Sequence, residues 1–239
     1  MKDYIKSSSS HALKNRNEFS LLKGLVPVVV VNKLPNDIDF NNIIKNLEKN
    51  IPSQILNLID GIYIGDFKEL EERNIEAMFK DGVIYLSSFK NIDYASEELI
   101  ARNICHELAH ALEEKMGYEI YGDKLIQNEF KAKKDKLISL LNHEGFYFSR
   151  NIFFDPDLTD ELDDLLYNEI GYDRLSLIIP NLFISPYSVT SIREYFANGV
   201  EEYLFGDPDL LKNVNPVLYS KINKIYNEVK KKWDVNIVK

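Results

Sequence analysis

Residues 96–117 read SEELIARNICHELAHALEEKMG, and this stretch decides the prediction of the fold. Its apolar residues recur at intervals of three and four, which is the period of an amphipathic helix. Gly117 supplies a helix stop signal, so we predict one helix over residues 96–116. The apolar positions that define it are Leu99, Ile100, Ile104, Cys105, Leu108, Ala109 and Leu112.

The predicted helix contains the HExxH arrangement His106-Glu107-Leu108-Ala109-His110. Residues four apart project from one face of a helix, so both imidazoles can reach one tetrahedral metal ion, with Glu107 one step around towards a metal-bound water. These are two of only four histidines in 239 residues. The pattern predicts one Zn²⁺ per chain, with His106 and His110 as ligands and Glu107 as general base.

Such a zinc site needs a third protein ligand and an open position for water. No histidine stands six residues after His110, where Met116 occurs, so we expect a carboxylate. One candidate is Glu129, after 18 intervening residues, on a helix surface where a glutamate contributes little to stability. The other is Glu194, which also forms a capping-box pattern with Ser191 that requires no metal.

The other periodic segments predict an α+β fold. Strand patterns cover residues 26–31, 62–65 and 83–86, and helical patterns cover 43–47, 124–141, 159–170, 191–205 and 216–233. We therefore expect a small mixed β-sheet packed on the HExxH helix and a mostly helical C-terminal half. Residues 1–22 are polar and are predicted to form a flexible tail. Residues 23–239 are predicted to form a single catalytic domain, with a helical insertion around 118–186.

Composition excludes several classes of partner. The formal net charge of −9 disfavours nucleic acid and anionic membrane surfaces. The longest apolar run, residues 25–31, contains Pro27 and is too short to span a membrane. One cysteine excludes an internal disulfide. The N-terminal sequence lacks the apolar stretch of a signal peptide, so we expect a cytoplasmic protein, or a secreted one if the sequence begins after a removed signal.

Three motifs together resemble the gluzincin metallopeptidases typified by anthrax lethal factor and the Pro-Pro endopeptidases. These motifs are HExxH, the later Glu194-Tyr195-Phe196-Ala197, and Tyr187 seven residues before Glu194. The resemblance covers about residues 60–210 and implies a zincin-like fold, with Glu194 as the third zinc ligand. It also implies that Tyr187 points into the active site and donates to the oxyanion.

The sequence departs from that family in two places. The interval from His110 to Glu194 is longer than expected, which predicts the insertion around 118–186. Asn198 stands where those relatives often carry a second glutamate.

The resemblance implies a zinc-dependent endopeptidase that hydrolyses peptide bonds by metal-activated water, in the manner of a toxin-like effector protease. Its partner would be a protein or peptide substrate. An extended substrate would pair with an edge strand, which we predict to be Val83, Ile84, Tyr85 and Leu86.

Two alternative functions remain open. One is a zinc aminopeptidase with Glu129 as third ligand, since the spacing from His110 to Glu129 is that of aminopeptidase-type gluzincins, although no GAMEN-like motif occurs. The other is a non-catalytic binding protein on a zincin scaffold. The intact Glu107 argues against this second alternative.

Overall fold

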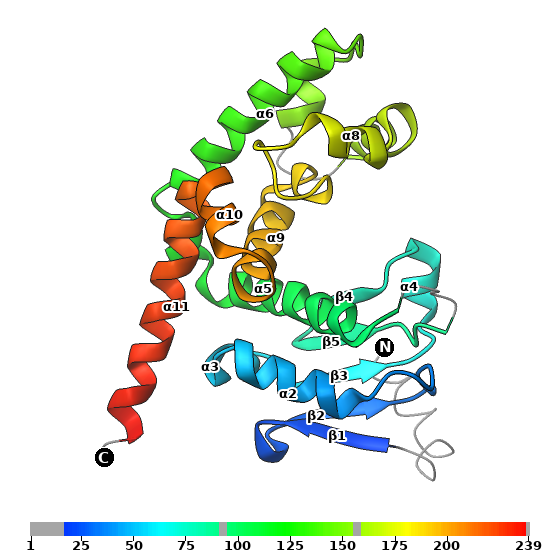
Figure 1. Ribbon diagram of the computed structural model, residues 1–239, viewed down its shortest axis with the longest axis vertical. Helices are drawn as coiled ribbons and strands as arrows, with labels where there is room; N and C mark the ends of the chain where they lie inside the picture. The colour runs from blue at the N-terminus through cyan, green and yellow to red at the C-terminus, as the bar shows by residue number, and fades with distance from the viewer. Residues whose placement is uncertain (1–16, 91–94, 155–158, 238–239) are drawn as a thin grey trace. The chain divides into compact units, whose positions relative to one another are not determined.

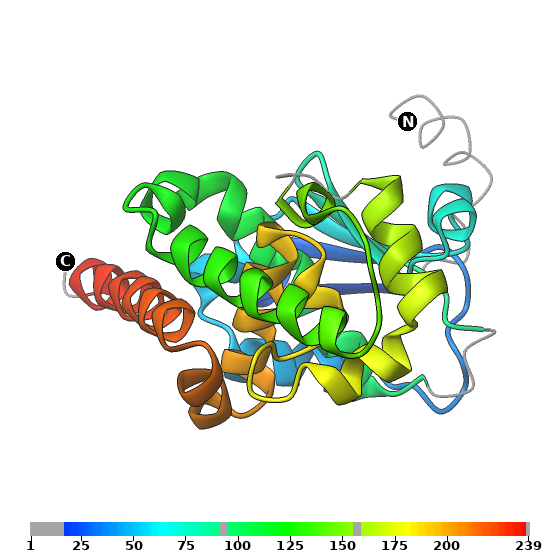
Figure 2. The same cartoon turned by 90° about the horizontal axis from the view of Figure 1, so that it is seen from above.

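The computed structural model describes residues 17–90, 95–154 and 159–237, and its helices and strands are labelled in Figure 1 and seen from above in Figure 2. The fold is α+β with a mixed sheet, as predicted. The chain divides into two compact units, residues 1–111 and 112–239. The division falls inside one long helix, a boundary that the sequence did not predict.

Unit 1 contains a five-stranded sheet in the order β1-β2-β3-β5-β4. The central strands β2, β3 and β5 are parallel, and the outer strands β1 and β4 pair antiparallel to their neighbours. Helices α2 and α3 connect β2 to β3, and α4 connects β3 to β4. The bounds are β1 (Asn17–Leu21), η1 (Leu22–Gly24), β2 (Val26–Val30), α2 (Phe40–Asn50), α3 (Ser53–Leu56), β3 (Gly61–Ile64), α4 (Lys68–Arg73), β4 (Ala77–Lys80) and β5 (Val83–Leu86).

The structure confirms the three predicted strands as β2, β3 and β5, and it adds β1 and β4. The prediction of a flexible tail over residues 1–22 is wrong for residues 17–21, which form β1. Residues 1–16 lie outside the described part of the chain. An edge strand needs few apolar side chains, since its backbone makes the pairing. The Phe19 ring of β1 packs against Phe40 of α2 with centroids 5.5 Å apart.

The prediction that Val83, Ile84, Tyr85 and Leu86 form an edge strand is wrong. This segment is β5, which lies between β3 and β4, so its backbone pairs on both sides. Side chains Ile84 and Leu86 are 0% exposed. The edge strand is β4, joined to β5 through Asp81 and Gly82, whose φ angles of 51° and 80° make the tight turn. The sequence indicated the turn, but not the short strand before it.

Unit 2 is helical, as predicted for the C-terminal half. Helices α6, α9 and α11 begin within one residue of their predicted starts, and α7 and η3 cover the predicted helix over 159–170. The bounds are α5 (Glu97–Tyr121), which begins in unit 1, α6 (Leu125–His143), η2 (Arg150–Phe154), α7 (Asp160–Asp164), η3 (Leu165–Ile170), α8 (Tyr172–Ile178), η4 (Tyr187–Val189), α9 (Ile192–Phe205), α10 (Pro208–Val214) and α11 (Pro216–Ile237).

Helix α5 is longer than predicted. It continues past Gly117 to Tyr121, and the backbone departs from helical angles at Met116, with φ −123° and ψ 23°. The glycine signal therefore marks a kink and not the end of the helix. Residues 97–115, which carry the HExxH motif, precede this kink.

Two sets of contacts hold the helices of unit 2 together. A methyl group added at Gly199 would come within 2.5 Å of Leu218 Cδ2, so α9 and α11 approach closely there. On α6, the buried Lys133 Nζ donates to the carbonyls of Leu182 and Val214 at 2.8 and 2.7 Å. Burial lowers the pKa of Lys133. Within the described residues, no helix has the length and apolar character needed to cross a bilayer.

Candidate metal centre

The two histidines of the HExxH motif lie on one face of α5. The His106 and His110 rings have centroids 5.1 Å apart and planes inclined by 76°. Both side chains are half-buried. The apolar face of the helix is buried and includes Ile104, Cys105 and Leu108. The predicted amphipathic helix therefore presents both imidazoles together.

Glu107 is buried, with 8% of its surface exposed, and the edge strand fixes its position. The backbone N–H of Phe79, on the outer side of β4, donates to Glu107 Oε2 at 2.6 Å. Figure 1 shows α5 running beside β4. A second hydrogen bond joins α5 to the residue before β4, from Asn103 Nδ2 to Glu76 Oε2 at 2.9 Å. Sequence reasoning missed Phe79 because it missed β4.

Glu194 lies in the first turn of α9. Ser191 is the N-cap of this helix, and its side chain accepts a hydrogen bond from the Glu194 backbone N–H at 3.1 Å. The structure therefore confirms one hydrogen bond of the predicted capping box, the bond from the Glu194 backbone to the Ser191 side chain. This contact uses the backbone N–H of Glu194 and not its carboxylate.

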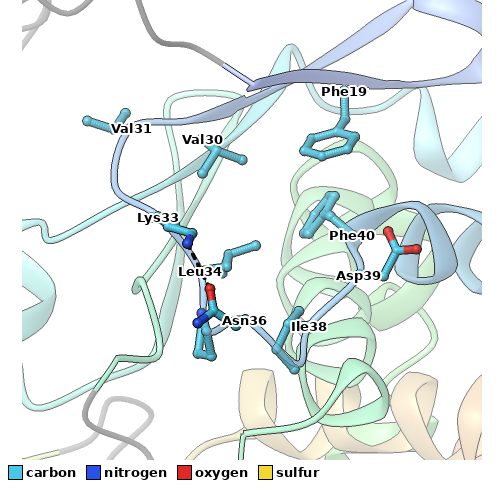
Figure 3. A pocket seen from close by; sticks show the side chains of 10 residues that line it. Phe19, Val30, Val31, Lys33, Leu34, Asn36, Ile38, Asp39 and Phe40 are labelled. Atoms are coloured by element: carbon cyan, nitrogen blue, oxygen red, sulfur yellow. Dashed lines mark hydrogen bonds between the residues drawn. The ribbon is translucent and has the colours of Figure 1, made fainter.

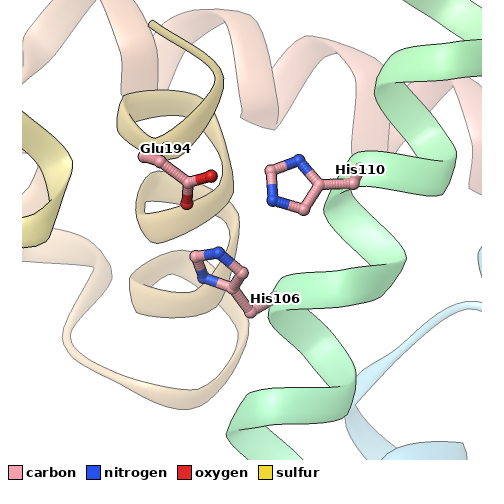
Figure 4. A group of neighbouring side chains, drawn as sticks. All are labelled: His106, His110 and Glu194. Carbon is pink, nitrogen blue, oxygen red and sulfur yellow. The ribbon is translucent and has the colours of Figure 1, made fainter. Parts of the chain in front are cut away.

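His106, His110 and Glu194 each offer one ligand atom, and these three atoms lie within 4.8 Å of one another. Figure 4 shows the Glu194 carboxylate facing the two imidazole rings. Two imidazole nitrogens and one carboxylate oxygen form a donor set typical of a zinc ion that keeps a fourth position for water. The group could therefore hold a metal ion, and the chemistry of its donors is compatible with zinc.

A second cluster continues from this group along α5. Glu113 lies three residues after His110 and is 8% exposed. It accepts from Tyr121 Oη at 2.7 Å and from Arg193 Nε at 2.9 Å. Arg193 precedes Glu194 in α9, so this ion pair joins the two helices next to the candidate ligands. Sequence reasoning missed the cluster, because no local pattern relates residues 80 positions apart.

The cluster shifts the ionisation of both partners of Glu113. Burial, together with the Glu113 carboxylate, raises the pKa of Tyr121 far above its usual range. The hydrogen bond to Glu113 raises the pKa of Arg193. Tyr121 therefore stays a neutral donor, and Arg193 stays a cation.

Glu129, the alternative third ligand, does not belong to the group of three. Its oxygens accept from Tyr195 Oη at 2.9 Å and from the backbone N–H groups of Val217 and Leu218, both at 3.0 Å. Glu129 therefore caps the first turn of α11 and anchors α9 through Tyr195. Burial raises the pKa of Tyr195, with the Glu129 charge adding to it. The expectation of a weakly contributing surface glutamate is wrong.

Tyr187 stands on the one-turn helix η4, with 43% of its surface exposed. Its neighbours Ser188, Val189 and Thr190 are 1% exposed or less. The Thr190 hydroxyl donates to the Tyr187 carbonyl at 2.8 Å. Buried neighbours and this hydrogen bond therefore anchor the turn, and the catalytic role of Tyr187 stays a prediction.

Asn198 links that turn to α9. Its Nδ2 donates to the Glu194 carbonyl at 2.8 Å, and its Oδ1 accepts from the Ser185 hydroxyl at 2.7 Å. Ser185 in turn accepts from the Ser188 backbone N–H at 3.1 Å. At the position where the family often has a second glutamate, this chain therefore has a neutral amide that connects the turn bearing Tyr187 to the helix bearing Glu194.

We expect Asn198→Ala to lower the free energy of unfolding by about 1–3 kcal/mol, because two part-buried groups, the Ser185 hydroxyl and the Glu194 carbonyl, each lose one hydrogen bond. Chemical denaturation measures this change. Asn227→Ala is the matched control, since Asn227 makes similar bonds to Asn223 on the exposed surface of α11. Equal stability of the two variants would contradict a linking role for Asn198.

Unit 1 also has a pocket of about 560 Å³. Figure 3 shows it between the aromatic rings of Phe19 and Phe40 and the segment that follows β2. Its polar lining includes Lys33, which donates to Asn36 Oδ1 at 2.7 Å. None of the predicted site residues lines this pocket.

Comparison of the chain with protein-family models, with curated proteins and with solved structures found no match in any of the three.

Proposed function

We propose that this protein is a zinc-dependent endopeptidase. The observation that carries the proposal is the grouping of His106, His110 and Glu194 within 4.8 Å, on the same helix as a buried Glu107. This combination supplies three metal ligands and a carboxylate base, which are the parts that metal-assisted hydrolysis needs.

When bound, the zinc ion would polarise the scissile carbonyl and make the attacking water more acidic. Glu107 takes the proton from that water and delivers it to the leaving amine. The Phe79 N–H holds one oxygen of Glu107. This contact limits the rotation of the carboxylate, which supports its proposed role in both proton transfers.

Tyr187 is proposed to donate its phenolic hydrogen to the oxyanion that develops on the substrate carbonyl. The buried turn around it and the link through Asn198 support this role, because a donor held in place needs no reorganisation during the reaction.

The outer edge of β4 is the proposed surface for the substrate backbone. It lies beside Glu107, as the Phe79 contact shows, and it is an edge of the sheet. An extended peptide can add to such an edge through main-chain hydrogen bonds. Glu107 already takes the Phe79 N–H, so the substrate backbone is proposed to pair with the remaining outward groups of β4.

The structure favours neither alternative function. An aminopeptidase with Glu129 as ligand would have to break the cap of α11. A non-catalytic binding protein would not need a buried carboxylate directly after the first histidine of the group.

The decisive experiment measures the zinc content of the purified protein and its cleavage of a mixed peptide library. We expect close to one zinc per chain and cleavage within peptides, lost on chelation and restored by zinc. A protein that binds zinc but cleaves no peptide would contradict the proposed function, and so would one that binds no transition metal.

We expect Tyr187→Phe to lower kcat by about 10²- to 10³-fold, the usual effect of losing one oxyanion donor. Steady-state kinetics on a library-derived peptide measures the change. Zinc content and KM should stay close to wild type, because the donor acts mainly in the transition state. Tyr147→Phe, at another exposed tyrosine, is the control. A wild-type kcat in Tyr187→Phe would remove half of the support for the family resemblance.

A further inference from the structure

Arg193 combines a fixed orientation with an exposed charge. Its Nε donates to Glu113 Oε2, while 62% of its side chain is exposed. Among the described residues, Glu113 is the only hydrogen-bond partner of the Arg193 side chain. No hydrogen bond within the described part of the chain uses the two terminal Nη groups.

The position of Arg193 places this cation next to the candidate metal ligands. It precedes Glu194 in α9, and its partner Glu113 lies three residues after His110, about 4.5 Å along the axis of α5. Tyr121 holds the other oxygen of Glu113. A buried carboxylate with two donors is a rigid anchor, so the guanidinium is oriented before any substrate arrives.

We infer that Arg193 is a specificity-determining residue that binds a carboxylate of the peptide substrate close to the scissile bond. This inference rests on the proposed function and names the substrate class of the same site: peptides with an acidic side chain, or a free C-terminus, near the bond that is cut.

The chemistry of the guanidinium favours a carboxylate over other groups. Its planar set of donors can bind two carboxylate oxygens at once, and such charge-assisted pairs are the stronger hydrogen bonds. The formal net charge of −9 means that the protein as a whole repels an acidic ligand. A preference for acidic peptides would therefore need a local cation, which Arg193 provides.

The test uses the zinc-loaded full chain and paired peptides from the library that differ only in Glu against Gln on either side of the cleaved bond. A second pair compares a free C-terminal carboxylate with its amide, which separates the two sources of the carboxylate. We expect wild type to prefer one acidic member by about tenfold in kcat/KM. Added salt should reduce the preference, because the guanidinium is partly exposed.

Arg193→Gln should bring the acidic-to-neutral ratio close to one, and Arg193→Lys should restore part of it by keeping the charge. Arg150→Gln is the matched control, because Arg150 pairs with Asp135 and its side chain is 65% exposed. Its ratio should equal that of wild type. A ratio of one in wild type, or an unchanged ratio in Arg193→Gln, would overturn the inference.

Binding of the same peptide pairs to zinc-loaded Glu107→Gln, measured by calorimetry, gives a ratio that does not depend on turnover. A wild type that hydrolyses acidic and neutral peptides equally contradicts the role of Arg193 and leaves the proposed function standing. A wild type that hydrolyses neither contradicts the proposed function, and the calorimetric ratio then decides the role of Arg193.

Discussion

Glu107→Gln is expected to keep its zinc and to lose peptidase activity by at least about 10²- to 10⁴-fold, the usual contribution of a general base. The amide has nearly the same shape as the carboxylate, and its oxygen can still accept from the Phe79 N–H. It cannot take a proton from water. Metal analysis and steady-state kinetics on one peptide measure the two properties separately.

Glu114→Gln is the control for this variant, because Glu114 is exposed on the same helix. It should match wild type in both measurements. Near-normal turnover in Glu107→Gln would contradict its role as base and would move the protein towards the class of binding proteins on a metal-holding scaffold.

Glu194→Ala and Glu129→Ala are expected to have opposite effects. Glu194→Ala should weaken zinc affinity by more than about 100-fold, since loss of a group that merely supports a ligand already costs about 10- to 100-fold. Glu129→Ala should instead lower the free energy of unfolding by about 3 kcal/mol, because it removes the helix cap of α11 and the partner of the buried Tyr195 hydroxyl.

Competition with a chelating dye measures zinc affinity, and denaturant unfolding of the metal-free protein measures stability. Each variant is the control for the other. If Glu129→Ala lost zinc while Glu194→Ala kept it, the assignment of the third ligand would be reversed, and the aminopeptidase alternative would gain support.

The sequence predicted those parts of the site that depend on local periodicity. His106, Glu107 and His110 share one helical turn, so the spacing alone places them together. The helices α6, α9 and α11 follow from regular apolar stripes. Glu194 required the comparison of separate motifs, because its position near the histidines depends on contacts between distant segments.

Other parts of the site have no local signal. The bond from Phe79 to Glu107 depends on β4, a four-residue strand with no alternation of buried and exposed side chains. Arg193 meets Glu113 across 80 residues, and Glu129 meets Val217 across 88. Such contacts result from the packing of whole helices. Gly117 shows the same limit, since α5 continues past this glycine to Tyr121, with a kink at Met116.

The hydrogen bond between Phe79 and Glu107 also bears on how the protein behaves at high concentration. An open edge strand can pair with the same strand of another molecule and start aggregation. Here a carboxylate occupies one of the outward N–H groups of β4, and Lys80 adds a charge at the end of the strand. The same contact therefore shortens the stretch of β4 with which a second copy could pair, and this second role would constrain the residue even in a relative that had lost its activity.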